Sequence, residues 1–107
     1  MKNYKKFFKN KKIKIMGLGL LRRGIGDAVF LAECGAMLTI TDIKTKKQLK
    51  ESLQKLKKFK KIKYVLGKHR LEDFKNTDLI LKNPAIPLGS IYIKEAKKNN
   101  IPIEMSA

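Results

Sequence analysis

Cysteine and acidic residues are scarce in this chain, and tryptophan is absent. The single cysteine, Cys34, cannot form an internal disulfide and has no second thiol for a metal site, so a disulfide-stapled domain is excluded. We expect it to be a small buried hydrophobic residue late in a helix. No apolar run approaches the roughly 20 residues that cross a bilayer, and the lysine-rich N-terminus lacks the apolar segment of a signal peptide. These absences predict a soluble, cytoplasmic protein.

The shortage of acidic residues leaves a large positive charge. The 107 residues include 26 Lys and Arg against 9 Asp and Glu, which gives a formal net charge of +17. Clustered basic residues bind nucleic acid, but here the lysines are spread along the chain and no recognised nucleic-acid module is present. The charge is therefore interpreted as a solvated lysine surface that binds polyanions without specificity at low salt, with no specific nucleic-acid partner and no membrane partner.

A glycine turn near the N-terminus is the central motif. An apolar run at residues 13–16 breaks at Gly17 and Gly19, and a helical pattern follows. A strand, tight turn and helix start form a cradle for a phosphate, because the helix's first N–H groups lack partners within the helix. The third glycine position of G-x-G-x-x-G holds Arg22, so the motif taken alone is equally consistent with an ordinary tight turn.

Strand and helix patterns alternate along the rest of the chain. This alternation predicts an α/β domain, a Rossmann-like doubly wound parallel sheet with helices on both faces and strand order 3-2-1-4-5. Residues 1–12, with Tyr4, Phe7 and Phe8, are expected to pack as a basic, aromatic segment on a domain of residues 13–107. The expected strands are residues 13–16, 37–42, 62–66, 78–81 and 101–105. The helix after the glycine turn is expected to end near Gly35. Further helices are expected over residues 46–61, 71–74 and 91–98, and Ser90 should cap the last of them.

The ligand crevice of such a sheet lies outside the carboxyl ends of strands one and four. The glycine turn, Asp42 and Asn83 should converge there. Asp42 follows the glycines by roughly 20 residues, where an acidic side chain reaches a ribose or a base. It could instead cap the turn after its strand, as aspartate commonly does. His69 is a lone loop histidine, which we interpret as a solvated residue and not as a catalyst.

Five short segments of the sequence occur in a recognisable order and spacing. They are Gly17-Leu18-Gly19-Leu20, Thr41-Asp42-Ile43-Lys44, Leu66-Gly67-Lys68-His69, Lys82-Asn83-Pro84-Ala85-Ile86-Pro87 and Ile101-Pro102-Ile103-Glu104. Together they resemble the N-terminal domain of the Mur ligases. The similarity covers about residues 12–107 and is greatest to the members that add D-glutamate to UDP-N-acetylmuramoyl-L-alanine during peptidoglycan synthesis. The Asn-Pro-Ala-Ile-Pro loop, in register with the other four segments, makes the match fairly specific.

The resemblance implies that the domain binds the UDP end of the muramoyl substrate. Backbone N–H groups of Leu20 and Leu21 would hold the diphosphate, and the segment 42–44 would hold the uracil with Gly67 beside the ring. The implied UDP-binding residues are Gly17, Gly19, Leu20, Leu21, Arg22, Asp42, Ile43, Lys44, Gly67 and Asn83.

Two positions depart from the family pattern. The family usually has a small hydroxyl residue and then glycine where this chain has Leu21 and Arg22, so Arg22 or Arg23 would supply charge to the diphosphate instead of a hydroxyl contact. An acidic residue often found near the end of the fifth strand is replaced by Ser106, so the role of that carboxylate is not carried over to this chain.

The chain has no P-loop of the form G-x-x-x-x-G-K-[ST]. In the family, ATP and Mg²⁺ bind with a central domain, and a C-terminal domain follows, so we expect an excised or truncated domain that has no catalytic residue, metal or cofactor of its own and is inactive alone. The alternative function is an NAD(P)-binding Rossmann domain of an oxidoreductase or sensor. A basic nucleic-acid-binding module is a third possibility, and it would need a cationic patch that composition alone does not show.

Overall fold

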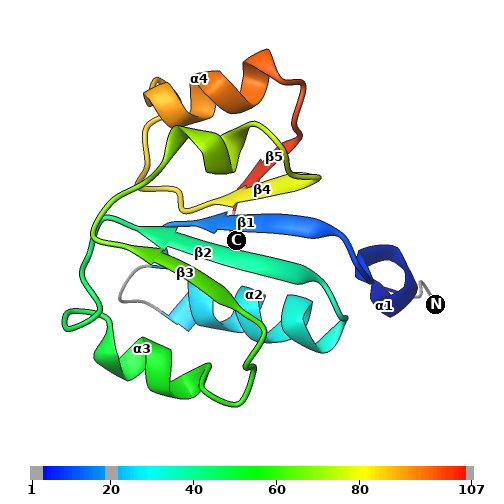
Figure 1. Ribbon diagram of the computed structural model, residues 1–107, viewed down its shortest axis with the longest axis vertical. Coiled ribbons are helices and arrows are strands. Elements are labelled where there is room, and N and C mark those ends of the chain that lie inside the picture. The colour runs from blue at the N-terminus through cyan, green and yellow to red at the C-terminus, as the bar shows by residue number, and fades with distance from the viewer. Residues whose placement is uncertain (1–3, 19–21, 106–107) are drawn as a thin grey trace.

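A five-stranded, all-parallel sheet forms the centre of the domain (Figure 1). The computed structural model describes residues 4–18 and 22–105. The strand order is β3-β2-β1-β4-β5, as the sequence predicted, which makes β1 the central strand. The strands are β1 (Lys12–Met16), β2 (Met37–Asp42), β3 (Lys63–Leu66), β4 (Leu79–Lys82) and β5 (Ile103–Met105).

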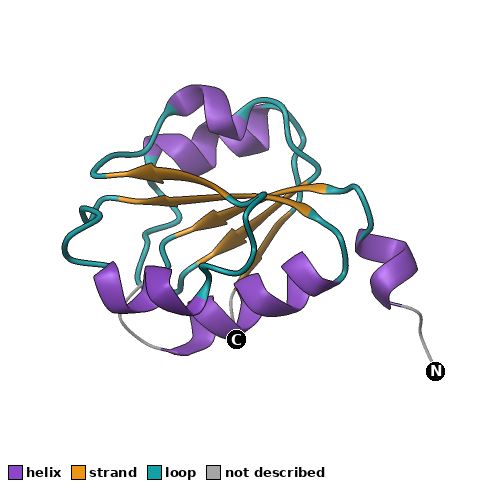
Figure 2. Ribbon diagram, turned by 60° about the horizontal axis from the view of Figure 1, so that its bottom comes forward, coloured by secondary structure: helices purple, strands orange, loops and turns teal. Residues whose placement is uncertain are grey.

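Helices cover both faces of the sheet (Figure 2). One face carries α2 (Arg22–Glu33) and α3 (Lys50–Lys55), and the other carries the 3₁₀ helix η1 (Leu71–Phe74) and α4 (Ile91–Lys98). A short helix, α1 (Tyr4–Phe8), lies near the start of β1. The Rossmann-like fold class is therefore confirmed.

Side-chain alternation along the strands divides the core between these two layers. Ile13 and Ile15 of β1 join Leu38 and Ile40 of β2 in the cluster beneath α2. The other cluster lies beneath η1 and α4 and consists of Met16, Phe74, Ile80, Ile93, Ala96 and Ile101. Because successive strand residues face opposite sides, β1 contributes to both layers and fixes their positions relative to the sheet.

Parallel pairing aligns the carboxyl ends of the strands that matter for a ligand. Met16 at the end of β1 is opposite Thr41 of β2 on one side and Lys82 of β4 on the other. The residues that follow these three strands therefore emerge at one edge of the sheet, on the left in Figure 1. This edge is where the predicted crevice was placed.

Several element boundaries differ from the prediction. The helix expected over 46–61 is ordered as α3 only over Lys50–Lys55, with turns on either side, although Leu49 and Leu56 are buried as the periodicity required. The fifth strand starts at Ile103 and not at residue 101, since Pro102 has no N–H to donate to a ladder. Ser90 caps α4 as predicted, its Oγ accepting a hydrogen bond from the Tyr92 N–H at 3.2 Å.

The N-terminal segment packs through one of its aromatic rings. Phe8 contacts the core beneath α2 and meets Phe30 edge to face, with 6.0 Å between ring centroids. Phe7 is 64% exposed. Cys34 is buried, as expected. Among the described residues, no helix is long and apolar enough to span a membrane.

Candidate ligand site at the carboxyl edge of the sheet

Gly17 begins the turn that leaves β1. Its φ of +85° lies in the left-handed region, which a side chain disfavours, and its N–H donates to the Thr41 carbonyl at 2.8 Å. A Cβ at this position would lie 2.8 Å from Ile86 Cδ1 and 2.9 Å from Asn83 Cβ. Both the backbone conformation and the close approach of the 83–87 loop therefore require glycine here.

Gly24 supplies the close helix packing that Arg22 cannot provide at the usual third glycine position. A Cβ on Gly24 would overlap the backbone carbonyl of Leu18, so the first turn of α2 can approach the glycine turn only because this side chain is missing. The departure noted at Arg22 is thus compensated two residues later. The predicted site residues Gly19, Leu20 and Leu21 lie outside the described residues, and so does Ser106.

Asp42 joins the glycine turn to the loop after β2. The residue is only 5% exposed, and its Oδ2 accepts a hydrogen bond from the Leu18 N–H at 2.9 Å. Its Oδ1 accepts another from the Lys44 N–H, also at 2.9 Å. The carboxylate therefore fixes two backbone segments at this edge of the sheet, which agrees with the turn-capping role considered from the sequence.

The loops after β2 and β3 lie together at this edge. The Gly67 N–H donates to the Lys44 carbonyl at 2.9 Å, and Gly67 has a φ of +83°. Ile43 is 67% exposed and Lys44 is half-buried. The structure thus brings Lys44 and Gly67 into contact beside the exposed apolar side chain of Ile43, with the buried Asp42 next to them in the chain.

Asn83 connects the fourth strand to the glycine turn. Its N–H donates to the Met16 carbonyl at 2.9 Å, and its side-chain amide makes a long hydrogen bond of 3.5 Å to the Gly17 carbonyl. Its Oδ1 accepts from the Ala85 N–H at 2.9 Å, which closes the turn into the proline loop. Gly17, Asp42 and Asn83 therefore converge at the carboxyl edge, as the sequence analysis expected.

Lys82 is a buried lysine at the end of β4 that the sequence analysis did not single out. It is 1% exposed, and its Nζ donates to the Asn83 carbonyl at 3.0 Å and to the Ile86 carbonyl. Those carbonyls belong to the loop that lies against Gly17. Its place at the end of a continuously apolar strand was the available sequence signal.

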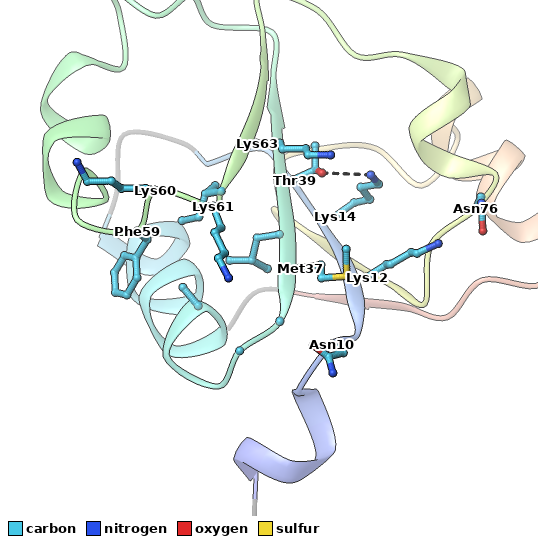
Figure 3. Close-up of a pocket in the computed structure, with 15 residues that line it drawn as sticks. Asn10, Lys12, Lys14, Met37, Thr39, Phe59, Lys60, Lys61, Lys63 and Asn76 are labelled. Atoms are coloured by element: carbon cyan, nitrogen blue, oxygen red, sulfur yellow. Dashed lines mark hydrogen bonds between the residues drawn. The ribbon is translucent and has the colours of Figure 1, made fainter.

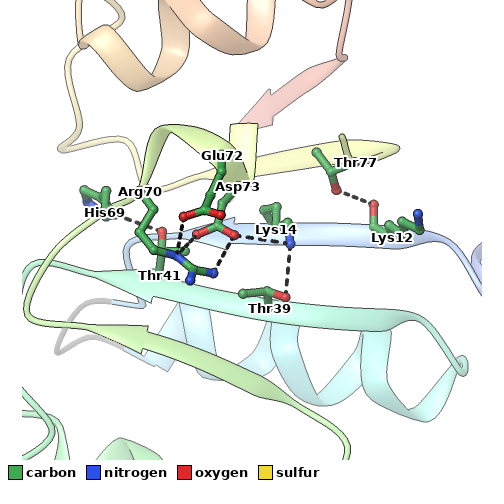
Figure 4. A network of polar contacts seen from close by, with 9 residues as sticks. All are labelled: Lys12, Lys14, Thr39, Thr41, His69, Arg70, Glu72, Asp73 and Thr77. Atoms are coloured by element: carbon green, nitrogen blue, oxygen red, sulfur yellow. Dashed lines mark hydrogen bonds and ion pairs between the residues drawn. The ribbon is translucent and has the colours of Figure 1, made fainter. Parts of the chain in front are cut away.

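The expectation that His69 is solvated was wrong. The ring is half-buried, its Nδ1 lies 2.9 Å from Thr41 Oγ1 (Figure 4), and it packs edge-on against Tyr92 with 5.2 Å between centroids. Burial lowers the pKa of His69 below its ordinary value of 6.5, while the carboxylates of Asp42 and Asp73 act in the opposite direction. A single sequence could not reveal this, because Tyr92 and Thr41 are distant along the chain.

A charged network fixes η1 over the sheet (Figure 4). Arg70 donates to both carboxylate oxygens of Asp73 at 2.9 Å, and Lys14 Nζ lies 3.7 Å from Asp73 Oδ1 and 3.2 Å from Thr39 Oγ1. The hydrogen bond to Asp73 raises the pKa of Arg70. Burial lowers the pKa of Lys14, against the raising effect of Asp73. The network thus joins Arg70, the neighbour of His69, to η1 and, through Asp73 and Lys14, to β1.

A groove of about 670 Å³ lies at the amino ends of the strands, opposite the glycine turn (Figure 3). Apolar residues that include Phe59 and Leu38 line the groove, together with five lysines: Lys12, Lys14, Lys60, Lys61 and Lys63. The groove is away from the glycine turn, and its cations suit nonspecific polyanion binding. Among the described residues, no group of three or more His, Cys, Asp or Glu side chains could hold a metal ion.

Comparisons with known proteins agree with the geometry of the edge. A protein 43% identical over 98 residues is named UDP-N-acetylmuramoylalanine--D-glutamate ligase, from Borreliella burgdorferi (strain ZS7); the match covers 91% of this chain and 22% of that protein. The protein of the same name from Treponema pallidum (strain Nichols) is 38% identical over 105 residues, with 97% and 20% covered. The chain thus spans about a fifth of the length of these curated relatives.

A solved structure shares the fold. It is a pseudomurein peptide ligase type C from Methanothermus fervidus, with a TM-score of 0.68 and 29% sequence identity, and the match covers 90% of this chain and 19% of that one. A family model described as "Mur ligase MurD-like, N-terminal domain" matches residues 11–104. On these matches, and with the strand order and glycine turn of the structure, the chain belongs to the MurD-like N-terminal domain family of the Mur ligases.

Proposed function

We propose that this domain binds the UDP end of UDP-N-acetylmuramoyl-L-alanine for an ATP-dependent ligase that adds D-glutamate to it. The observation that carries the proposal is that Asp42, bonded to Leu18, and Asn83, bonded to Gly17, both meet the glycine turn at the carboxyl edge. A ligand in an open α/β sheet binds at this edge, where the strand order reverses. The choice of substrate is supported by the relatives, which are named as ligases that join UDP-N-acetylmuramoylalanine and D-glutamate.

The diphosphate would sit at the start of α2. Backbone N–H groups of Leu20 and Leu21 would donate to its oxygens, with Gly17 and Gly19 allowing close approach and Arg22 adding charge. The helix has no acidic residue in its first turn, so nothing in that turn repels a phosphate.

The uracil would lie on the surface formed after β2 and β3. Ile43 offers an exposed apolar contact to one face of the base, and Gly67 leaves room beside it. Backbone groups near Asp42 and Lys44 are already oriented by the Asp42 carboxylate, so their remaining donors and acceptors are fixed before the base arrives. Asn83 would border the sugar and phosphate side of the crevice.

We further propose that residues 13–107 form the substrate-binding domain and residues 1–12 an N-terminal segment packed on it. The ATP, the Mg²⁺ and the amino-acid acceptor would be held by further domains of the ligase. This division accounts for two observations: the chain covers only about a fifth of the length of its relatives, and it contains no P-loop.

Calorimetric titration of the purified chain with UDP, a UDP-sugar and NAD tests the ligand preference. The experiment is run near physiological salt, where the positive surface is partly screened. We expect UDP and the UDP-sugar to bind more tightly than NAD, because any diphosphate can use the helix start and only the loops after β2 and β3 discriminate the base. Tighter binding of NAD would overturn the proposal and favour a dinucleotide-binding domain.

A further inference from the structure

Within residues 4–18 and 22–105, the buried ammonium group of Lys82 has no carboxylate partner. Its side chain is 1% exposed, and no Asp or Glu oxygen among the described residues lies within ion-pair distance of its Nζ. Two backbone carbonyls, those of Asn83 and Ile86, accept two of its three N–H groups. Buried charges in proteins are ordinarily paired with an opposite charge, so this lysine is an exception that needs an explanation.

The two buried carboxylates among the described residues, Asp42 and Asp73, have other partners. Asp73 makes a bidentate contact with Arg70 and lies near Lys14. Asp42 receives the N–H groups of Leu18 and Lys44. Neither carboxylate neutralises Lys82 at contact distance, so its charge acts on whatever anion enters the neighbouring crevice.

Lys82 lies next to the glycine turn. It is paired across the sheet with Met16, the residue before Gly17. The two residues whose carbonyls it holds, Asn83 and Ile86, are the same two whose side chains lie against Gly17. Both carbonyl oxygens accept hydrogen bonds from the ammonium group and therefore point toward it. Because they point toward Lys82, they do not repel a phosphate at the glycine turn.

We propose that Lys82 is a positioning residue that favours an anionic ligand group at the glycine turn, and specifically the diphosphate of a nucleoside diphosphate. It acts by fastening the 83–87 loop against Gly17 and by placing a fixed positive charge behind it. The identity of the nucleoside rests on the proposed function. The preference of this position for an anionic group rests on the structure alone.

Burial gives this charge a property that the surface lysines do not have. Mobile ions screen exposed charges over about 8 Å at physiological ionic strength, but they screen a group excluded from water much less. The contribution of Lys82 should therefore persist at salt concentrations that abolish nonspecific attraction to the lysine surface.

Three substitutions separate the charge from the hydrogen bonds. Lys82→Met removes both and keeps a similar length of apolar stem, Lys82→Gln removes the charge but keeps a donor for the loop, and Lys82→Arg keeps both. Lys94→Met is the matched control, because Lys94 is an exposed lysine of α4 and its loss changes the net charge equally. Each protein is titrated with UDP and with uridine, which lacks the phosphates, at physiological and at high salt.

We expect Lys82→Met and Lys82→Gln to weaken UDP binding by about tenfold, the scale of one charge-assisted contact, at both salt concentrations. Uridine binding should be nearly unchanged, and Lys82→Arg and Lys94→Met should resemble the parent. An equal loss of affinity for UDP and uridine would overturn the proposal, since a purely structural role of Lys82 disturbs both ligands. Should Lys82→Met fail to fold, Lys82→Gln carries the same test.

A second measurement is independent of the nucleoside. Inorganic pyrophosphate, at ionic strength matched with sodium chloride, should raise the unfolding temperature of the parent and raise that of Lys82→Gln clearly less. No stabilisation of the parent, or equal stabilisation of both proteins, would overturn the role of Lys82. Failure of the parent to prefer UDP over NAD would instead overturn the proposed function and leave this result standing.

Discussion

The backbone carbonyl of Leu18 occupies the space where a side chain on Gly24 would begin. Leu18 belongs to the turn after β1, and Gly24 lies in the first turn of α2. Their contact sets the distance between the glycine turn and the start of the helix. The binding of a phosphate by backbone N–H groups depends on this distance. Leu18 also donates its N–H to Asp42, so the same residue is fixed from both sides.

This contact predicts opposite effects for two alanine substitutions in one helix. Gly24→Ala forces backbone to move and should lower the free energy of unfolding by about 1–3 kcal/mol. Gly26→Ala is the matched control: its position is exposed, no described atom lies within 4 Å of a Cβ there, and alanine should raise the free energy of unfolding by about 0.5–1 kcal/mol. Urea denaturation of both variants measures the difference. Equal changes would show that α2 does not depend on the Leu18 contact.

The sheet was predictable from the sequence because its signals are local. Apolar runs such as 37–42 and 79–82 are too short for buried helices, and the glycines and prolines between the elements mark where each one stops. Alternation of strands and helices then permits few topologies. The convergence of Gly17, Asp42 and Asn83 followed from the strand order without any knowledge of side-chain positions.

The features missed by the sequence depend on distant neighbours. His69 is buried by Tyr92 and bonded to Thr41, and nothing in the sequence around it records either contact. Lys82 looks like one of many surface lysines until β4 is placed beneath the 83–87 loop. The glycine at position 24 can be read from the sequence, but its packing role depends on the position of the Leu18 carbonyl, which only the structure gives.

Substitution of Asp42 should affect both folding and UDP binding. Asp42→Ala leaves the Leu18 N–H without its buried acceptor, which should cost about 1–3 kcal/mol of unfolding free energy. Asp42→Asn keeps one acceptor oxygen and should cost less. Both variants should also weaken UDP binding in calorimetry, because the loop that meets the uracil loses its orientation.

Asp78→Asn provides the control for Asp42. Asp78 also accepts a backbone N–H, that of Lys12 at 2.8 Å, but at the opposite end of β1. This variant should lose stability without losing affinity for UDP. If the Asp42 variants bind UDP like the parent while only their stability falls, Asp42 is a turn cap and the uracil lies elsewhere.

The chain by itself should form no amide bond and hydrolyse no ATP. Its sequence supplies no P-loop lysine, and we place the Mg²⁺ ligands in other domains of the ligase. Given ATP, Mg²⁺, the muramoyl-alanine nucleotide and D-glutamate, the purified chain should release no phosphate above the background of a heat-denatured sample. Turnover that copurifies with the chain through successive columns would contradict the division of labour proposed above.

Protonation of His69 should destabilise the fold. Burial lowers the pKa of His69 in the folded chain below its ordinary value of 6.5, so the unfolded chain takes up the proton first as the pH falls. The stability that the neutral ring contributes is therefore complete above pH 6.5 and is lost as the pH falls through the folded-state pKa. A charged ring would also have to remain against Tyr92 and Phe74.

His69→Asn separates this effect from other titrations, because asparagine can still bond Thr41 Oγ1 but does not titrate. Asp42 and Asp73, the carboxylates that act on the ring, are present in both proteins and cancel in the comparison. Between about pH 7.5 and pH 5, a window that brackets the ordinary histidine pKa, the free energy of unfolding should fall further in the parent than in His69→Asn. NMR titration of the ring gives the folded-state pKa directly and should place it below 6.5. Parallel stability curves for the two proteins, or a ring pKa above 6.5, would show that the carboxylates outweigh burial at this site.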